Sequence, residues 1–425
     1  MVSKEYPRIG ETMLHARLEN GLHIYVDQKP EFQKSYAFFA ANYGGMDMKF
    51  RLDGVWQDTP AGVAHFLEHK MFDTEDGNAL QDLAANGASP NAFTSSAMTG
   101  YYFESTEKFY ENLKILLSFV SIPWFTRESV DKEQGIIGQE IRMVEDDPDN
   151  QVFYALMECL FDHHPIRVPI AGTRESISHI TVDTLYACHK AFYTPSNMVL
   201  TVAGNVDAQR VIETAREILP RESGGRIERD YGAEERGKAA APGKQLRMAV
   251  STPIFQLGCK ADTAPAGEER LRRQLVSELA CEALLGTSSP LYADLYRKGL
   301  INKNFGYGFE QYPGCALLAA GGESREPEAV RGAVLAEARR LAERGLEEAF
   351  FQRLKRSGYG ARVRALNSFE TICIEQAQAH FAGFEYLRFP ELYADIGREH
   401  VEECLRRLAE PERWALAVVR PGGQA

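Results

Sequence analysis

The stretch GVAHFLEHKMF, residues 62–72, places two histidines and a glutamate within five residues. Side chains four residues apart lie on one face of a helix, so the imidazoles of His65 and His69 can reach a single ion. Glu68 directly precedes His69 and projects from a neighbouring direction, where a carboxylate can act without itself holding the ion. An ordinary helix could also carry these residues by coincidence. A metal site therefore requires a third ligand elsewhere in the chain.

The best candidates for that third ligand lie in EQGIIGQEIRMVEDD, residues 133–147. Glu133 and Glu140 are two turns apart and share one face of a predicted helix. Apolar residues occupy the same face, and a carboxylate there needs a partner because burying it alone is costly. A catalytic zinc ion takes three protein ligands and keeps one open position. The pattern itself leaves Glu133 and Glu140 as equal alternatives.

The composition indicates a globular protein with more than one domain, because 425 residues exceed the usual size of a single domain. No apolar run reaches the roughly 18 residues of a membrane span. The N-terminal residues lack the apolar core of a signal peptide, so we expect a cytoplasmic protein that does not bind membranes. The net charge of −12 argues against nucleic acids as partners. Seven scattered cysteines without a CxxC pair predict reduced thiols.

Strand and helix patterns recur in a similar order in two halves of the chain, on either side of a polar segment. The first half ends in the apolar strand NMVLTVAG, residues 197–204, and the second in WALAVVRP, residues 414–421. We therefore predict an α+β fold with domains at 1–218 and 245–425, joined by a linker at 219–244. The second half has no counterpart of the two histidines, so we expect its domain to be metal-free.

Two stretches, AGVAHFLEHKMF and the later GIIGQEI, resemble the H-x-x-E-H motif and the distant glutamate of the pitrilysin/insulinase zinc peptidases. Three further stretches resemble segments of the same family, in the family's order: NGASPNAFTSSAMTGYYFES (residues 86–105), HHPIRVPIAGT (163–173) and YTPSNMVLTVAGNVD (193–207). The resemblance is strong across the first half of the chain and is one of architecture in the second half.

The resemblance implies two tandem α/β-roll domains of the mitochondrial processing peptidase and insulinase type, with antiparallel-rich sheets packed against helices. It also implies a zinc metalloendopeptidase with one Zn²⁺ per chain. Carried over by position, His65, His69 and Glu140 would be the zinc ligands. Glu68 would be the general base that takes a proton from the attacking water.

The resemblance assigns three further residues to the site. Glu133 matches an acidic position that would orient a metal ligand or the water without binding the metal itself. It could also be a helix glutamate without such a role. Asn91 and Ala92 match the edge strand along which extended peptide substrates lie. Asn91 could instead be a simple turn residue after Pro90.

One feature of the family does not match. Family members often carry an arginine and, seven residues later, a tyrosine that hold the substrate near the oxyanion. In LYADLYRKGLINKNFGYG, residues 291–308, Tyr296 stands at the arginine position and Arg297 is one residue late. Tyr307 lies too far along to be the tyrosine. The resemblance therefore implies that the chain lacks this pair.

The family's closed chamber needs four α/β units, and this chain supplies two. The resemblance thus implies a dimer, preferably a heterodimer with a metal-free homologous subunit that carries the arginine and tyrosine. A homodimer is the alternative, since isologous homodimers are the commonest oligomers. HFLEHKMF also resembles a bacterial branch associated with 5-aminopentanol modification of elongation factor P.

Two other functions are compatible with the same fold. The chain could be a non-proteolytic subunit of a peptidase-fold complex that binds a partner or peptides. Relatives of that kind have generally lost the metal motif, whereas His65, Glu68, His69 and Glu140 are all present here. A purely structural zinc is disfavoured, because structural sites usually have four protein ligands and are rich in cysteine.

Overall fold

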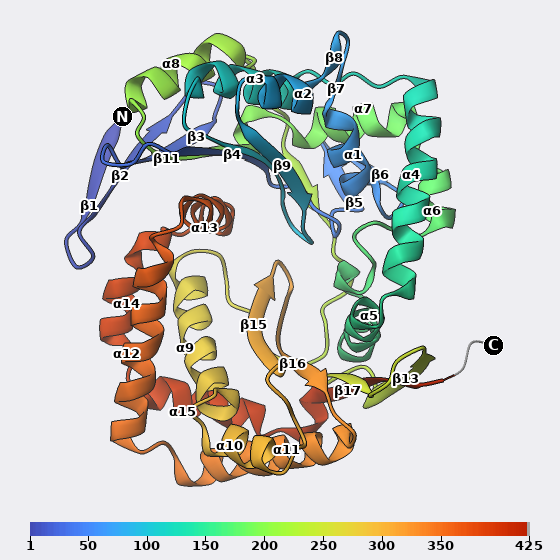
Figure 1. The fold of residues 1–425 in the computed structure, drawn as a ribbon, viewed down its shortest axis with the longest axis vertical. Helices are drawn as coiled ribbons and strands as arrows, with labels where there is room; N and C mark the ends of the chain where they lie inside the picture. The colour runs from blue at the N-terminus through green and yellow to red at the C-terminus, as the bar shows by residue number, and fades with distance from the viewer. Residues whose placement is uncertain (423–425) are drawn as a thin grey trace. The chain divides into compact units, whose positions relative to one another are not determined.

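The computed structural model describes residues 1–422 and shows helices packed against antiparallel-rich sheets, which confirms the predicted fold class (Figure 1). Contacts group the chain into two compact units. The first unit comprises Met1–Ile141, Val168–Tyr231 and Val363–Leu387, and the second comprises Arg142–Arg167, Gly232–Arg362 and the residues from Arg388 onward. None of the helices in the described part of the chain is both long enough and apolar enough to cross a bilayer.

The first unit is built on a seven-stranded sheet. Its strands, in spatial order, are β1 (Val2–Tyr6), β2 (Glu11–Arg17), β3 (His23–Gln28), β11 (Met198–Gly204), β4 (Ser35–Ala41), β10 (Thr99–Ser105) and β9 (Ser89–Thr94). The pairing of β3 with β11 is parallel, and the other pairings in this sheet are antiparallel. Every residue of β4 and β11 is buried. Such continuous burial is expected of strands covered on both faces.

Helices cover both faces of this sheet (Figure 1). One face carries α1 (Val63–Met71), α2 (Ala79–Ala85), α3 (Phe109–Ser121) and α8 (Ala208–Ile218), with α7 (Val182–Phe192) against α1. The other face carries α13 (Phe369–Ala382), which contacts β4 and β11. Phe369, Cys373 and Ala377 of α13 form a core with Tyr36 and Phe38 of β4. The fold thus packs α1 against β9 and β10, on the face of the sheet opposite α13.

Smaller elements complete the first unit. They are a three-stranded sheet of β12 (Ile227–Arg229), β5 (Lys49–Leu52) and β6 (Val55–Asp58), the short pair β7 (Asp73–Thr74) and β8 (Gly77–Asn78), and helices α4 (Arg127–Asp146) and α6 (Arg174–Ser178). The last turn of α4 continues into the second unit. The part of α4 before that turn carries both glutamates singled out in the sequence.

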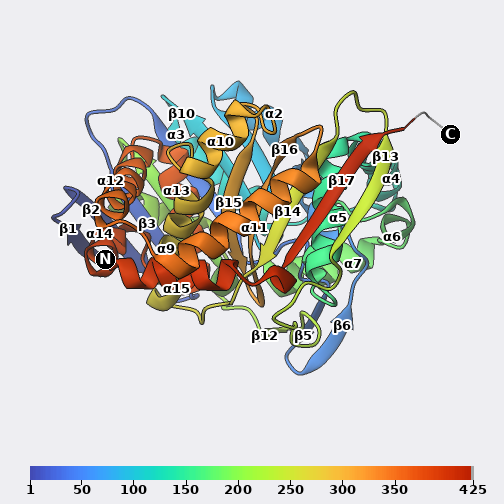
Figure 2. The same cartoon turned by 90° about the horizontal axis from the view of Figure 1, so that it is seen from below.

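The second unit is built on a five-stranded sheet (Figure 2). Its strands, in spatial order, are β13 (Gly243–Met248), β17 (Trp414–Pro421), β14 (Ile254–Lys260), β16 (Cys315–Glu323) and β15 (Gly306–Tyr312). The helices that contact this sheet are α5 (Pro148–Leu160), α9 (Glu268–Leu285) and α11 (Pro327–Arg344). Around them lie α10 (Pro290–Arg297), α12 (Glu348–Ala365), α14 (Phe389–Asp395) and α15 (Arg398–Leu408).

The two sheets repeat one topology. The order β3-β11-β4-β10-β9 corresponds strand for strand to β13-β17-β14-β16-β15, with one parallel pairing followed by three antiparallel ones in each. In both, the last strand of the unit inserts between earlier strands. This repeat is the tandem relationship that the sequence predicted.

The contacts divide the chain differently from the consecutive domains 1–218 and 245–425. Each sheet takes one covering helix from the other half of the sequence, because α13 packs on the first sheet and α5 on the second. A sheet needs an apolar cover on each buried face, and helical periodicity does not tell which sheet a helix covers. The consecutive boundaries, as limits of separately folding domains, stay a prediction.

The polar segment at 219–244 is anchored at two buried carboxylates. Within the first unit, Arg229 Nε donates to the carboxylate of Asp47 over 2.9 Å, and Asp47 is 2% exposed. Within the second unit, Glu235 pairs with the buried Lys260 at 2.6 Å. A carboxylate out of water is stable only when such partners satisfy it. The segment predicted as a linker is therefore fixed on each unit.

The cysteines fit the predicted reduced state. All seven are free of disulfides, and six of them are buried. Burial raises the pKa of the Cys188 thiol to about 12, which keeps it protonated and unreactive near neutral pH.

A histidine cluster lies where the end of α13 meets the first sheet. His380 Nδ1 is 3.2 Å from the hydroxyl of Tyr25, and the rings of His380 and His23 are centred 4.6 Å apart. His23 Nδ1 is in turn 2.9 Å from His15 Nε2. Burial, and then repulsion from neighbouring histidines, lowers the pKa of His23 and His380 to about 4 each. The cluster is therefore uncharged near neutral pH.

We predict that acid weakens this part of the fold. The folded pKa of about 4 lies below the ordinary value of 6.5, so the unfolded chain binds more protons between these pH values. Protonation of the more buried His380 alone should lower the free energy of unfolding by about 2 kcal/mol as pH drops from 7 to 4.5. Urea unfolding should show a smaller fall in His380→Gln, while the exposed His179→Gln should follow the wild type. Equal falls in all three proteins would contradict the prediction.

Candidate metal centre

Two glycines fix the start of α1. Gly62 has a φ of 96°, and a Cβ there would lie 2.6 Å from the carbonyl oxygen of Ala171. A Cβ on Gly172 would lie 2.4 Å from the carbonyl oxygen of Ala61. Ser176 Oγ also donates to that Ala61 oxygen over 2.8 Å. The loop that contains HHPIRVPIAGT, residues 163–173, thus holds the first turn of α1, at a closeness that only glycine permits.

Helix α1 directs its polar residues to one side because its apolar residues are buried in the core. Phe66 and Leu67 are fully buried, which fixes the rotation of the helix. His65 and His69 then face α4, with side chains 12% and 27% exposed. Their rings are centred 4.6 Å apart and are nearly edge to face.

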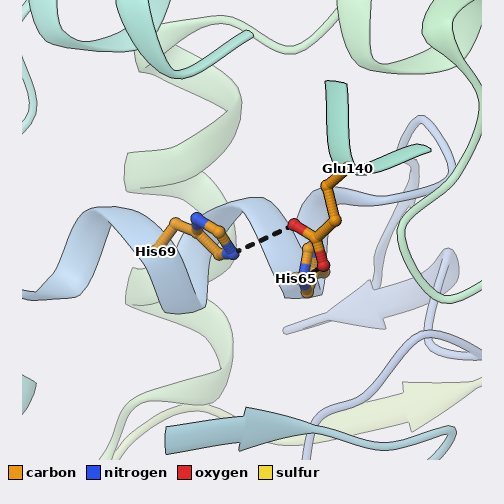
Figure 3. Close-up of side chains that lie close together, drawn as sticks. All are labelled: His65, His69 and Glu140. Atoms are coloured by element: carbon orange, nitrogen blue, oxygen red, sulfur yellow. Dashed lines mark ion pairs between the residues drawn. The ribbon is translucent and has the colours of Figure 1, made fainter. Parts of the chain in front are cut away.

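Glu140 of α4 points toward both imidazoles (Figure 3). Its carboxylate oxygens lie 3.4 Å from His65 Nε2 and 3.6 Å from His69 Nε2. One ligand atom from each residue falls within 4.8 Å of the others, and no other group of this kind occurs among residues 1–422. The structure therefore brings together the three residues that the resemblance assigned as ligands.

The spacing of these atoms fits a small cation. Two bonds of about 2.0 Å at a tetrahedral angle separate the two ligand atoms by about 3.3 Å. The contacts of 3.4 Å and 3.6 Å are close to that separation and too long for strong hydrogen bonds. Two imidazole nitrogens and a carboxylate oxygen are also a donor set that suits zinc. The residues present thus fit the expected ion.

Glu133 lies behind His69 and outside the group of three. Its Oε1 is 3.1 Å from His69 Nδ1, which leaves His69 Nε2 directed toward Glu140. Its Oε2 is 3.5 Å from the buried ammonium of Lys70, which also pairs with Asp73. A carboxylate on the far nitrogen is the usual way of fixing the tautomer of a metal-binding histidine. The geometry separates the two glutamates that the sequence pattern left equal.

Neighbouring carboxylates favour positive charge, from a proton or a metal ion, at this site. Burial alone would lower the pKa of His69, but the hydrogen bond to Glu133 and the neighbouring carboxylates raise it overall. The contact with His65 is the main cause that lowers the pKa of Glu140. The carboxylate is therefore ionised near neutral pH, and a metal ion would compete with a proton for His69.

Glu68 lies on α1 beside this group and does not belong to it. Glu68 is 9% exposed, and its Oε2 accepts a hydrogen bond of 2.6 Å from Thr94 Oγ1. The sequence analysis did not single out Thr94, although it lies within NGASPNAFTSSAMTGYYFES, one of the stretches that resemble the family.

Asn91 and Ala92 lie on β9, which is the edge strand of the seven-stranded sheet. Asn91 is exposed, and its Oδ1 accepts a hydrogen bond of 2.9 Å from the Ala92 N–H. Asn91 pairs in register with Tyr102 of β10, so it is a strand residue and not a turn residue. The roles of Asn91 and Ala92 in binding stay predictions.

The residues considered for the oxyanion lie in the second unit. Tyr296 is on α10 and 54% exposed. Arg297 pairs with Asp294 at 2.6 Å, and the Tyr307 hydroxyl on β15 donates to Glu282. Arg297 and Tyr307 thus each have a partner within their own unit.

Two protein-family models match the chain in succession. The model described as insulinase (Peptidase family M16) matches residues 54–174, which include the candidate metal centre. The model described as the Peptidase M16 inactive domain matches residues 179–357. The second half of the chain thus resembles the family's inactive domain, in line with the absence of an H-x-x-E-H motif there.

Individual relatives match over the whole length. YmfH of Bacillus subtilis (strain 168), named an uncharacterized zinc protease, is 36% identical over 98% of this chain and 98% of its own. The crystal structure of an M16-like peptidase from Alicyclobacillus acidocaldarius has a TM-score of 0.94 at 31% identity, over 99% of this chain and 100% of that one.

A longer chain shares the fold. The periplasmic protease PqqL from Escherichia coli has a TM-score of 0.76 at 16% identity, over 99% of this chain and 48% of its own. Identity at that level shows the fold alone. The full-length match to YmfH and the two matched family models show the family itself. This chain belongs to the insulinase/pitrilysin family of peptidases, M16.

Proposed function

We propose that this chain is a zinc-dependent metalloendopeptidase that hydrolyses peptide bonds in peptides or unfolded segments. The observation that carries the proposal is the convergence of His65, His69 and Glu140, with their ligand atoms within 4.8 Å of one another. The zinc protease name of YmfH supports the choice of metal. In the proposed enzyme these three residues hold one Zn²⁺ per chain, and Glu133 orients His69.

Each residue of the proposed site has a distinct task. A bound zinc ion would supply Lewis acidity, which makes a water molecule nucleophilic near neutral pH and polarises the scissile carbonyl. Glu68 accepts the proton of the attacking water and passes it to the leaving amine. Glu133 keeps His69 in the tautomer whose Nε2 is free to bind. The side chain of Glu68 is largely shielded from bulk water, because the residue is only 9% exposed.

Peptides would bind to the free edge of β9. The Ala92 N–H is directed away from β10, because it donates to the Asn91 side chain. Pro90 has no N–H, which suits a position at an open sheet edge. An extended peptide can therefore add as a further strand, with main-chain hydrogen bonds and little dependence on its sequence.

We predict that Glu140→Gln abolishes tight zinc binding. Loss of a group that hydrogen-bonds to a metal ligand weakens metal binding about 10- to 100-fold. Loss of a ligand itself should therefore weaken zinc binding more than about 100-fold. Elemental analysis should give one zinc per chain in the wild type and a sharply reduced content in the variant. Glu133→Gln should be intermediate, and the exposed Glu145→Gln on the same helix should equal the wild type. A zinc-free wild type, even after reconstitution, would instead favour the non-proteolytic subunit.

We predict that Glu68→Gln retains zinc and loses nearly all turnover. The amide keeps the size of the side chain but cannot take a proton, and proton transfer of this kind contributes about 10²- to 10⁴-fold to the rate. The check is kcat on internally quenched peptides together with zinc content. The exposed Glu75→Gln should behave as the wild type. A Glu68→Gln protein that cleaves peptides at the wild-type rate would contradict the role proposed for Glu68.

The proposed enzyme acts as a dimer, preferably with a metal-free homologous subunit. This chain aligns with 48% of PqqL, which supports a pairing of two such chains. Arg297 and Tyr307 each have a local partner, which supports an oxyanion pair supplied by another chain. The homodimer, the cytoplasmic location and the branch associated with elongation factor P remain predictions.

The predicted partner can be tested directly. Native mass spectrometry of the protein purified from its own host should show a second chain of similar size without an H-x-x-E-H motif. Adding that chain to the purified enzyme should raise peptide turnover at constant zinc content. Full activity from a complex that holds this chain alone would contradict the heterodimer and support the homodimer.

A further inference from the structure

Thr94 connects the edge strand to the proposed general base. It is the last residue of β9, and its Oγ1 lies 2.6 Å from Glu68 Oε2. The threonine hydroxyl donates in this hydrogen bond, and the carboxylate oxygen accepts. A distance of 2.6 Å lies within the usual range for a hydrogen bond between two oxygen atoms. The bond therefore ties the end of β9 to one oxygen of the Glu68 carboxylate.

This hydrogen bond selects one carboxylate oxygen. Within residues 1–422 Thr94 is the hydrogen-bond partner of Glu68, and it engages Oε2. Oε1 is then left to receive a proton. A carboxylate held at one oxygen has a defined rotation, whereas a free glutamate side chain has several rotamers.

Thr94 is itself held firmly from the sheet. It pairs in register with Thr99 of β10, which pairs with Ala41 of β4. Thr99 Oγ1 lies 3.4 Å from Thr94 Oγ1 and donates to the Tyr43 carbonyl oxygen over 2.9 Å. The position of the Thr94 hydroxyl is thus fixed by the central strands of the first unit.

The main chain of Thr94 also faces the open edge. The Ala92 N–H points away from β10, and backbone directions alternate along a strand, so those of Pro90, Ala92 and Thr94 match. A peptide strand added to β9 would therefore meet the Thr94 backbone. The same residue would bind the peptide through its main chain and Glu68 through its side chain.

We propose that Thr94 is a positioning residue that couples peptide binding on β9 to the orientation of the Glu68 carboxylate. This inference rests on the proposed peptidase function. Removing the Thr94 hydroxyl should lower kcat more than it changes KM, because the Thr94 side chain does not contact the peptide. Peptides that extend along β9 as far as Thr94 gain most from the coupling.

The test compares Thr94→Val, which keeps the shape without the hydroxyl, with Thr94→Ser, which restores the hydroxyl. A misplaced catalytic group costs up to about 100-fold, so kcat of Thr94→Val should fall about 10- to 100-fold. KM for internally quenched peptides should stay within about twofold of the wild type. Zinc content should not change, and Thr94→Ser should recover most of the lost kcat.

Thr201→Val is the matched control. Thr201 is a buried sheet threonine on β11, and its hydroxyl donates to the Cys373 carbonyl oxygen over 2.9 Å. Its substitution should lower the melting temperature and leave kcat unchanged. A fall in kcat that tracks the melting temperature across all three variants would overturn the proposal.

A crystal structure of Thr94→Val separates this inference from the proposed function. The Glu68 carboxylate should leave its wild-type position or occupy more than one rotamer, and it should return in Thr94→Ser. An unmoved Glu68 in Thr94→Val would overturn the positioning role. Absence of peptide cleavage by the zinc-loaded wild type and its partner would count against the peptidase function, while the structures would still decide the role of Thr94.

Discussion

The contact between α1 and α4 determines whether the site exists. His69 Nδ1 meets Glu133 at 3.1 Å, and this contact sets the register in which two turns of α4 run past α1. Glu140 then falls opposite the outer nitrogens of both histidines. A shift of one residue along α4 would rotate its carboxylates by about 100° and carry Glu140 away from the imidazoles. The pairing of the two helices is thus the condition on which metal binding depends.

Three segments distant in sequence hold that arrangement in place. Close approach at Gly62 and Gly172 fixes where α1 begins, and its apolar residues fix how it is rotated. From the other side, Thr94 at the end of β9 holds the carboxylate of Glu68. The edge strand proposed to bind a peptide and the residues proposed to bind a metal are therefore directly connected within the first unit.

Local sequence pattern predicted the parts of the site and not their assembly. Helical spacing was enough to place His65 and His69 on one face, because that relation lies within a single helix. The same spacing could not separate Glu140 from Glu133, since both share a face and the distinction depends on contacts with another helix. Two other features are likewise non-local: the exchange of α5 and α13 between the sheets, and the hydrogen bond from Thr94 to Glu68. Hydrophobic periodicity along the sequence does not predict either of them.

The central claim is that His65, His69 and Glu140 form one zinc site. Anomalous X-ray diffraction from zinc-loaded crystals, recorded on both sides of the zinc absorption edge, tests it most directly. One strong peak is expected within about 2 Å of the two imidazole Nε2 atoms and of the Glu140 carboxylate. A crystal with no peak there, or with its zinc bound elsewhere, would contradict it.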